Sequence, residues 1–157
     1  MKVEFWVTGK TNEAYLEEGI GIYLKRVVRY LPFGMEILPD IKQAKNLSPA
    51  QLKEKESQQV LSRLKPEDCL ILLDEKGKQF GSEQFAGWLD GQLQGTARRL
   101  IFVVGGAYGF SPALYDRANS MLSLSGMTFS HQMVRLFFLE QLYRAMTILK
   151  NEPYHNA

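Results

Sequence analysis

Short apolar segments that alternate with helical patterns are the feature that most constrains how this chain can fold. Two of these segments, residues 69–73 (CLILL) and 100–104 (LIFVV), are apolar at every position. A strand of that composition is buried on both faces, as in a parallel sheet with helices packed against both sides. The alternation therefore predicts an α/β fold, with a mostly parallel sheet and helices on both of its faces.

The rest of the chain repeats the same strand–helix unit. Further strands are expected at residues 3–7, 33–38 and 121–124, and helices are expected to begin near residues 12, 48, 82, 111 and 131. Two of these helix starts carry Ser followed by Pro, a pair that caps a helix and costs it no hydrogen bond. A length of 157 residues predicts a single domain covering residues 1–157.

The expected final helix, from about His131 to Asn151, has apolar side chains on nearly all sides. A helix of that kind is buried on more than one side. Because the sheet of so small a chain can cover only one side, the pattern favours a partner subunit on the other. The sequence thus leads to the hypothesis of a homodimer.

Composition excludes several classes of protein. With Cys69 as the single cysteine, neither a disulfide framework nor a cysteine-rich metal site can form, and no metal is expected. The net charge of +2 does not by itself indicate a nucleic-acid partner. The absence of a long apolar segment and of a signal-peptide pattern predicts a cytoplasmic protein without a membrane partner.

A glycine-rich loop follows the 100–104 strand, in the sequence FVVGGAYGF at residues 102–110. Glycine lets a backbone approach a ligand closely, and parallel α/β proteins bind ligands where their strands end. The spacing G-G-x-x-G differs from the G-x-G-x-x-G of dinucleotide-binding loops, and the TGKT segment at residues 8–11 lacks the first glycine of a P-loop. A tight turn without a ligand is the alternative interpretation.

A second loop, LSLSGMTFS at residues 122–130, follows the next expected strand and could form the other wall of the same pocket. Neither loop contains Lys or Arg, which a cradle for phosphate would need. The two loops therefore predict a pocket with neutral walls, suited to a planar base and a short aliphatic tail.

Side chains able to transfer protons lie late in the chain. His131 and His155 could each exchange a proton near neutral pH, although a histidine at a helix start is more often structural. Glu140 and Arg144 are spaced as an ordinary helical ion pair, which is the alternative to a functional role for Arg144. The tail sequence PYH at residues 153–155 is aromatic and basic, and we expect it to complete a site.

Together these motifs resemble the ribosomal RNA large subunit methyltransferase H family, the pseudouridine N3-methyltransferases of the SPOUT class. The resemblance covers the whole chain, through VTGK, ILLDEKGK, VVGGAYG, LSLSGMTFSHQMVRLFFLEQLYRA and the closing PYH. It implies an α/β fold with a C-terminal deep trefoil knot, a homodimer, and S-adenosylmethionine as methyl donor. The implied acceptor is a pseudouridine of 23S rRNA, on the large ribosomal subunit or the assembled 70S ribosome.

The resemblance also implies roles for individual residues. A general base or a cation that stabilises the deprotonated acceptor would come from the late side chains, with Tyr154 and His155 facing the substrate. Arg135 and Arg144 would contact RNA phosphate or the ring oxygens, and His131 is a further candidate base. The residues implied to hold the methyl donor are Leu73, Gly105, Leu124, Ser125, Gly126, Met127, Thr128 and Phe129.

Two positions depart from the family pattern. Several relatives have an acidic or polar residue where this chain has Tyr108, and proline where it has Ser130. The second change affects only the helix cap, since Ser is a good N-cap residue. The competing functions are a non-catalytic ribosome-binding factor of the same fold and a nucleotide-dependent oxidoreductase, against which the missing dinucleotide pattern argues.

Overall fold

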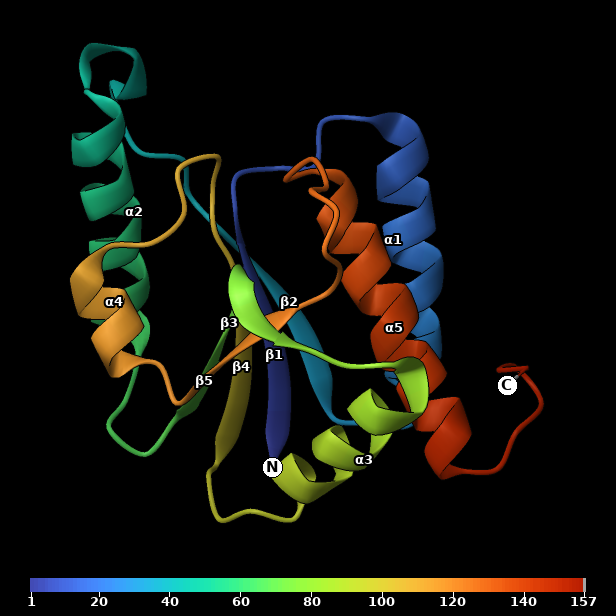
Figure 1. Ribbon diagram of the computed structural model, residues 1–157. Helices are drawn as coiled ribbons and strands as arrows, with labels where there is room; N and C mark the ends of the chain where they lie inside the picture. The colour runs from blue at the N-terminus through green and yellow to red at the C-terminus, as the bar shows by residue number, and fades with distance from the viewer. Residues whose placement is uncertain (157) are drawn as a thin grey trace.

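The computed structural model describes residues 1–156 and places five parallel strands in one sheet, in the order β2-β1-β4-β3-β5 (Figure 1). The elements are β1 (Lys2–Thr8), α1 (Ala14–Val27), β2 (Phe33–Leu38), the 3-10 helix η1 (Ala44–Asn46), α2 (Pro49–Arg63), β3 (Cys69–Gln79), α3 (Ser82–Leu93), β4 (Arg99–Val104), α4 (Pro112–Arg117), β5 (Ser120–Ser123) and α5 (Met133–Leu149).

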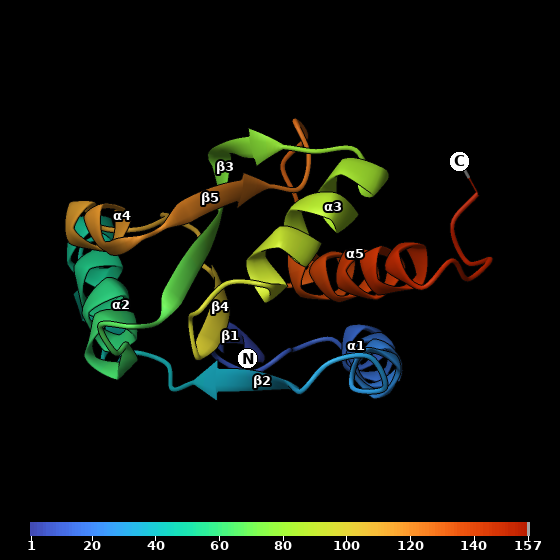
Figure 2. The same cartoon turned by 90° about the horizontal axis from the view of Figure 1, so that it is seen from below.

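Helices cover both faces of the sheet, as the apolar strands predicted (Figure 2). Alternate residues of β4 point to opposite faces, so that Phe102 packs with α1, α3 and α5 while Val103 packs with α2 and α4. The predicted parallel α/β architecture is therefore confirmed. Among residues 1–156, no helix is long and apolar enough to span a membrane.

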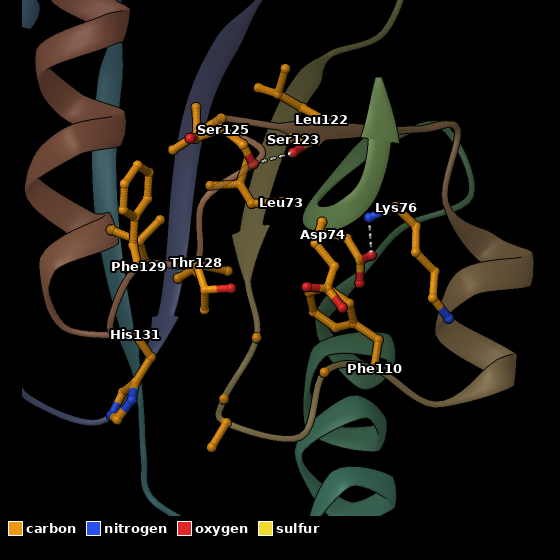
Figure 3. A pocket seen from close by; sticks show the side chains of 18 of the residues that line it. Leu73, Asp74, Lys76, Phe110, Leu122, Ser123, Ser125, Thr128, Phe129 and His131 are labelled. Atoms are coloured by element: carbon orange, nitrogen blue, oxygen red, sulfur yellow. Dashed lines mark hydrogen bonds between the residues drawn. The ribbon is translucent and has the colours of Figure 1, made fainter. Parts of the chain in front are cut away.

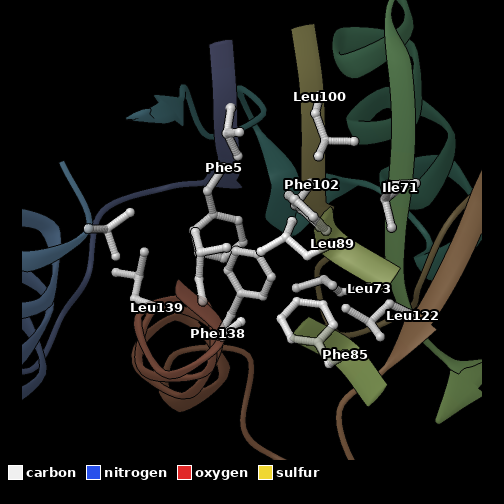
Figure 4. Close-up of a cluster of buried hydrophobic side chains, with 14 of the residues drawn as sticks. Phe5, Ile71, Leu73, Phe85, Leu89, Leu100, Phe102, Leu122, Phe138 and Leu139 are labelled. Carbon is white, nitrogen blue, oxygen red and sulfur yellow. The ribbon is translucent and has the colours of Figure 1, made fainter. Parts of the chain in front are cut away.

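Helix α5 is held against the sheet by aromatic side chains (Figure 4). The ring of Phe138 lies 4.6 Å from that of Phe5 on β1 and 4.8 Å from that of Phe102 on β4, measured between centroids. All three side chains are fully buried, and each contributes about 1.5–3 kcal/mol to stability by leaving water. The contact places α5 between α1 and α3, beneath the centre of the sheet.

Strand β3 is longer than the predicted segment 69–73, because it continues through charged residues to Gln79. Leu73 and Lys78 both pair with Leu122 of β5, so the ladder is interrupted between the two positions. In this interruption Gly77 lies directly on the β5 backbone, where an added Cβ would be 2.6 Å from Leu122 N. Only glycine permits so close a crossing.

We predict that Gly77→Ala lowers the free energy of unfolding by about 3 kcal/mol, because the added methyl group overlaps backbone that cannot rotate away. Gly87→Ala is the matched control. Nothing lies within 4 Å of a Cβ at Gly87 in α3, so this change should raise stability by roughly 0.5–1 kcal/mol. Urea unfolding measures the free energy of unfolding of both variants. Equal values for Gly77→Ala and Gly87→Ala would contradict the close crossing of β3 over β5.

Candidate functional site

A cavity of about 560 Å³ opens at the carboxyl ends of the central strands (Figure 3). Three segments form its walls: the end of β3, the glycine loop after β4, and the chain between β5 and α5. Carboxyl ends of parallel strands are the usual place for a ligand in this class of fold. The two loops that the sequence analysis paired thus face one cavity.

The glycine loop presents its backbone to the cavity. Gly109 has a φ of +80°, and its N–H donates to Gly106 O at 3.3 Å, which closes a tight turn. A Cβ at Gly105 would lie 3.1 Å from the ring of Phe110 and 3.3 Å from Gly109 O. A side chain at Gly105 would therefore be crowded, and with glycine the loop exposes peptide groups at this point.

The second loop is organised by its own serines. Ser123 Oγ donates to Ser125 O at 3.0 Å, and Ser125 Oγ accepts from Met127 N at 2.9 Å. Phe129 packs against Phe137 of α5, with ring centroids 4.8 Å apart. Of the eight residues expected to hold a cofactor, Gly126 alone falls outside the cavity lining, although it lies in the same turn. The other seven line the cavity: Leu73, Gly105, Leu124, Ser125, Met127, Thr128 and Phe129.

The third wall corrects the expectation of a neutral pocket. Asp74, Glu75 and Lys76 line the cavity from the end of β3. Asp74 accepts hydrogen bonds from Lys76 N at 2.9 Å and from the Tyr115 hydroxyl at 2.5 Å. Burial and the bond to Asp74 raise the pKa of Tyr115 to about 12, so this phenol stays protonated. The sequence does contain a signal for this wall: three charged residues follow the apolar segment 69–73 directly, at the end of a strand where this class of fold binds ligands.

Tyr115→Phe should reduce stability by about 1–2 kcal/mol at neutral pH, since a hydrogen bond to a carboxylate is lost. Because the folded pKa of Tyr115 lies above its ordinary value of 10, this contribution is present below pH 10 and is lost as pH rises through about 12. Urea unfolding from pH 7 upward measures it. Tyr108→Phe, at a tyrosine that is 52% exposed, is the control, and equal effects of both changes at pH 7 would contradict the prediction.

His131 lies on the cavity wall with its side chain exposed to solvent. The neighbouring Gln132 side chain fastens this helix start to the loop after β1, by accepting from Asn12 N at 2.8 Å and donating to Lys10 O at 3.3 Å. Ser130 Oγ accepts from Met133 N at 3.0 Å, and Ser130 O accepts from Val134 N at 3.0 Å, so Ser130 fixes the turn that leads into α5. The imidazole is therefore held at the edge of the cavity by a fixed helix end.

Arg135 is not placed where it could contact RNA phosphate, which corrects that expectation. Its side chain is 2% exposed, and its guanidinium donates to Thr8 O and Gly9 O at 2.8 Å and to Thr11 Oγ1 at 3.2 Å. Burial lowers its pKa. Arg135 is thus a positioning residue that joins the end of β1 to α5.

The tail residues form a separate cluster around Glu140. The Glu140 carboxylate accepts from Arg144 at 2.5 Å and from the Tyr154 hydroxyl at 3.0 Å. Arg144 Nη1 also lies 3.0 Å from His155 Nδ1, and the hydroxyls of Tyr154 and Tyr23 are 3.1 Å apart. Burial and the bonds to Tyr23 and Glu140 raise the pKa of Tyr154. The expected Glu140–Arg144 ion pair is present, and the tail residues Tyr154 and His155 form hydrogen bonds with it.

One chain does not bring this tail cluster to the cavity. Arg144 lies thirteen positions after His131 along α5, which corresponds to about 20 Å of helix. Figure 1 accordingly shows the tail leaving the lower end of α5, away from the loop at which this helix begins. Over residues 1–156 there is also no group of three His, Cys, Asp or Glu side chains arranged to hold a metal ion.

Comparison with known proteins gives consistent similarities. A family model described as "Predicted SPOUT methyltransferase" matches residues 1–155. Proteins named ribosomal RNA large subunit methyltransferase H are 56% identical in Parabacteroides distasonis and 53% identical in Christiangramia forsetii, each over 99% of both chains. A crystal structure described as a probable methyltransferase from Bordetella pertussis Tohama I matches 92% of this chain and 93% of its own, with a TM-score of 0.52 and 15% identity, and shows the fold alone.

Proposed function

Since the chain belongs to the SPOUT methyltransferase family and its relatives are named ribosomal RNA large subunit methyltransferase H, we propose that it is an rRNA methyltransferase. In this proposal it transfers the methyl group of S-adenosylmethionine to N3 of a pseudouridine in 23S rRNA. The observation that carries the proposal is the cavity of about 560 Å³ between the glycine loop and the serine-organised loop.

The residues around the cavity fit this methyl donor. The volume lies within the roughly 300–1,000 Å³ of small-molecule sites, and the walls combine apolar side chains with open peptide groups at Gly105. The two carboxylates of Asp74 and Glu75 outnumber the ammonium of Lys76 on one wall, which favours a cationic ligand. When bound, S-adenosylmethionine supplies an electrophilic methyl group on a sulfonium. The residues that would hold it are Leu73, Gly105, Leu124, Ser125, Gly126, Met127, Thr128 and Phe129.

The acceptor nitrogen must lose its imide proton to a general base. The hydrogen bonds of the tail cluster show which side chains remain candidates for that role. Because Arg144 can only donate, His155 Nδ1 accepts from it, which leaves the proton on Nε2. The raised pKa of Tyr154 keeps its hydroxyl protonated. Both tail residues are thus donors that could stabilise a deprotonated ring oxygen. His131, on the cavity wall, is left as the candidate base.

A homodimer would bring the tail and the cavity together. The α1–α5 surface exposes three large apolar side chains: Tyr15 is 62%, Ile22 45% and Phe137 36% exposed. If two copies pair antiparallel through this surface, the tail of one protomer reaches the cavity of its partner. The apolar side chains on nearly all sides of α5 led us to expect a dimer. The same dimer would overcome the distance of about 20 Å that separates the cavity from the tail cluster along that helix.

Membership of the SPOUT family also bears on the path of the chain and on the RNA partner. We infer that the chain carries the family's deep trefoil knot, and the close crossing of β3 over β5 at Gly77 supports this. A net charge of +2 gives weak non-specific attraction to RNA, which favours a shaped substrate such as the large subunit or the 70S ribosome. The protein would act in the cytoplasm, where ribosomes are.

Replacing the tail donors tests the reaction. We expect His155→Ala to slow single-turnover methyl transfer from S-adenosylmethionine to ribosomes by about 100-fold, a typical loss for one donor that stabilises developing charge. Calorimetric affinity for S-adenosylmethionine should stay unchanged. Exposed Lys55→Ala, on α2, is the control. Binding of ribosomes without any methyl transfer by the wild type would instead favour the non-catalytic factor.

Mixing two inactive variants tests the dimer. Gly105→Ala should distort the donor site, because the Phe110 ring and the Gly109 carbonyl of the same loop must move to admit its Cβ. Tyr154→Ala combined with His155→Ala removes the tail donors. If each site uses the cavity of one protomer and the tail of the other, an exchanged equimolar mixture regains about a quarter of the wild-type active sites. Recovery no greater than the sum of the separate variants would show that each chain works alone.

A further inference from the structure

A second cavity, of about 320 Å³, lies where the end of α1, helix α5 and the tail meet. Its lining residues are Arg26, Arg29, Tyr30, Tyr143 and Tyr154. Of these only Tyr154 takes part in the proposed reaction. The lining combines two guanidinium groups with phenol rings and contributes no carboxylate.

The nearby carboxylates are already occupied by other groups. Glu152 accepts from the Tyr30 hydroxyl at 2.6 Å, and Glu140 accepts from Arg144 and Tyr154. Across residues 1–156, the ion pairs join Arg99 to Glu4 and Asp68, and Arg144 to Glu140. Arg26 and Arg29 are therefore cations without an acidic partner in the part of the chain described.

Arg26 is also held in position before any ligand arrives. Its guanidinium carbon lies 5.0 Å from the ring centroid of Tyr23 and 5.4 Å from that of Tyr143. Stacking on two rings restricts a long side chain that otherwise loses entropy on binding. A planar guanidinium presents paired N–H groups that match the oxygens of a phosphate.

We propose that this cavity binds a phosphodiester group of the RNA substrate, through Arg26 and Arg29. Tyr154 belongs to both this cavity and the tail cluster, so the bound phosphate would lie beside the tail donors. The site would hold the RNA strand next to the nucleotide that is modified. The proposal rests on the proposed function only in assigning the phosphate to the RNA substrate. Whether the cavity binds phosphate can be tested without measuring methyl transfer.

The Tyr30 and Tyr154 hydroxyls donate to Glu152 and Glu140, so the two guanidinium groups are the donors that face an anion. The hydrogen bond to Glu152 and burial raise the pKa of Tyr30 to about 12, so its phenol remains neutral beside a phosphate. Cations in the last turn of α1 also stabilise that helix end, a role that needs no ligand. A test must therefore separate RNA affinity from stability.

The test compares Arg29→Gln with Lys55→Gln. Both replace one exposed cation by a neutral side chain, but Lys55 lies on α2, on the other face of the sheet. Fluorescence anisotropy with a labelled oligouridylate of about 12 nucleotides, within the span of single-strand sites, measures affinity over a salt series. Arg26→Lys is a second variant that keeps the charge but loses the paired N–H groups. Thermal unfolding of each variant reports on α1.

We expect R29Q to weaken RNA binding about fivefold and to reduce the slope of log affinity against log salt by about 0.7, the value for one phosphate contact on a single strand. K55Q should change neither, and R26K should weaken binding while keeping the slope. With ribosomes, R29Q should raise KM for the ribosome and leave kcat and S-adenosylmethionine affinity unchanged.

Two results would overturn the phosphate site: no binding of the oligouridylate by the wild type, or equal affinities of R29Q and K55Q. The proposed function fails separately. If the wild type transfers no methyl group to ribosomes but R29Q still loses RNA affinity relative to K55Q, the phosphate site stands and the assigned reaction does not.

Discussion

The contact of Phe138 with Phe5 and Phe102 holds α5 against the sheet, and the positions of His131 and of the tail cluster depend on it. The turn that leads into this helix carries His131 to the cavity, and the far part of the helix carries Arg144 and the tail. Because Phe138, Leu139 and Leu142 are fully buried on the sheet-facing side of α5, the helix cannot slide or rotate without losing several kcal/mol of apolar burial. The aromatic contact therefore sets the separation between the cavity and the tail cluster.

Charge is divided between the two ends of the molecule in a way that matches the proposed ligands. Asp74 and Glu75 line the cavity that would take a cationic methyl donor, whereas Arg26 and Arg29 line the cavity that would take phosphate. A net charge of +2 conceals this separation, since it sums over both sites. Local arrangement, and not total charge, carries the recognition of each ligand.

Several features could be predicted from the sequence because their causes are local. The bounds of β2 and the start of α2 at Ser48–Pro49 follow from apolar pattern and capping, which act over a few residues. The second half of β3 was missed, since its charged residues pair with β5 only through a contact distant in the chain. The role of Arg135 escapes prediction for the same reason: its position near the site suggests contact with RNA, but its guanidinium donates to carbonyl groups more than a hundred positions away.

By itself, the sequence determined the α/β class, the two loops that face one cavity and the family to which the chain is similar, because periodicity and motif spacing are read along the chain. Only the tertiary structure decided that a charged wall completes the cavity, that Arg135 is buried, and that the tail lies about 20 Å away along α5. Those outcomes depend on which surfaces pack together, and packing joins residues such as Asp74 and Tyr115 that no local pattern relates.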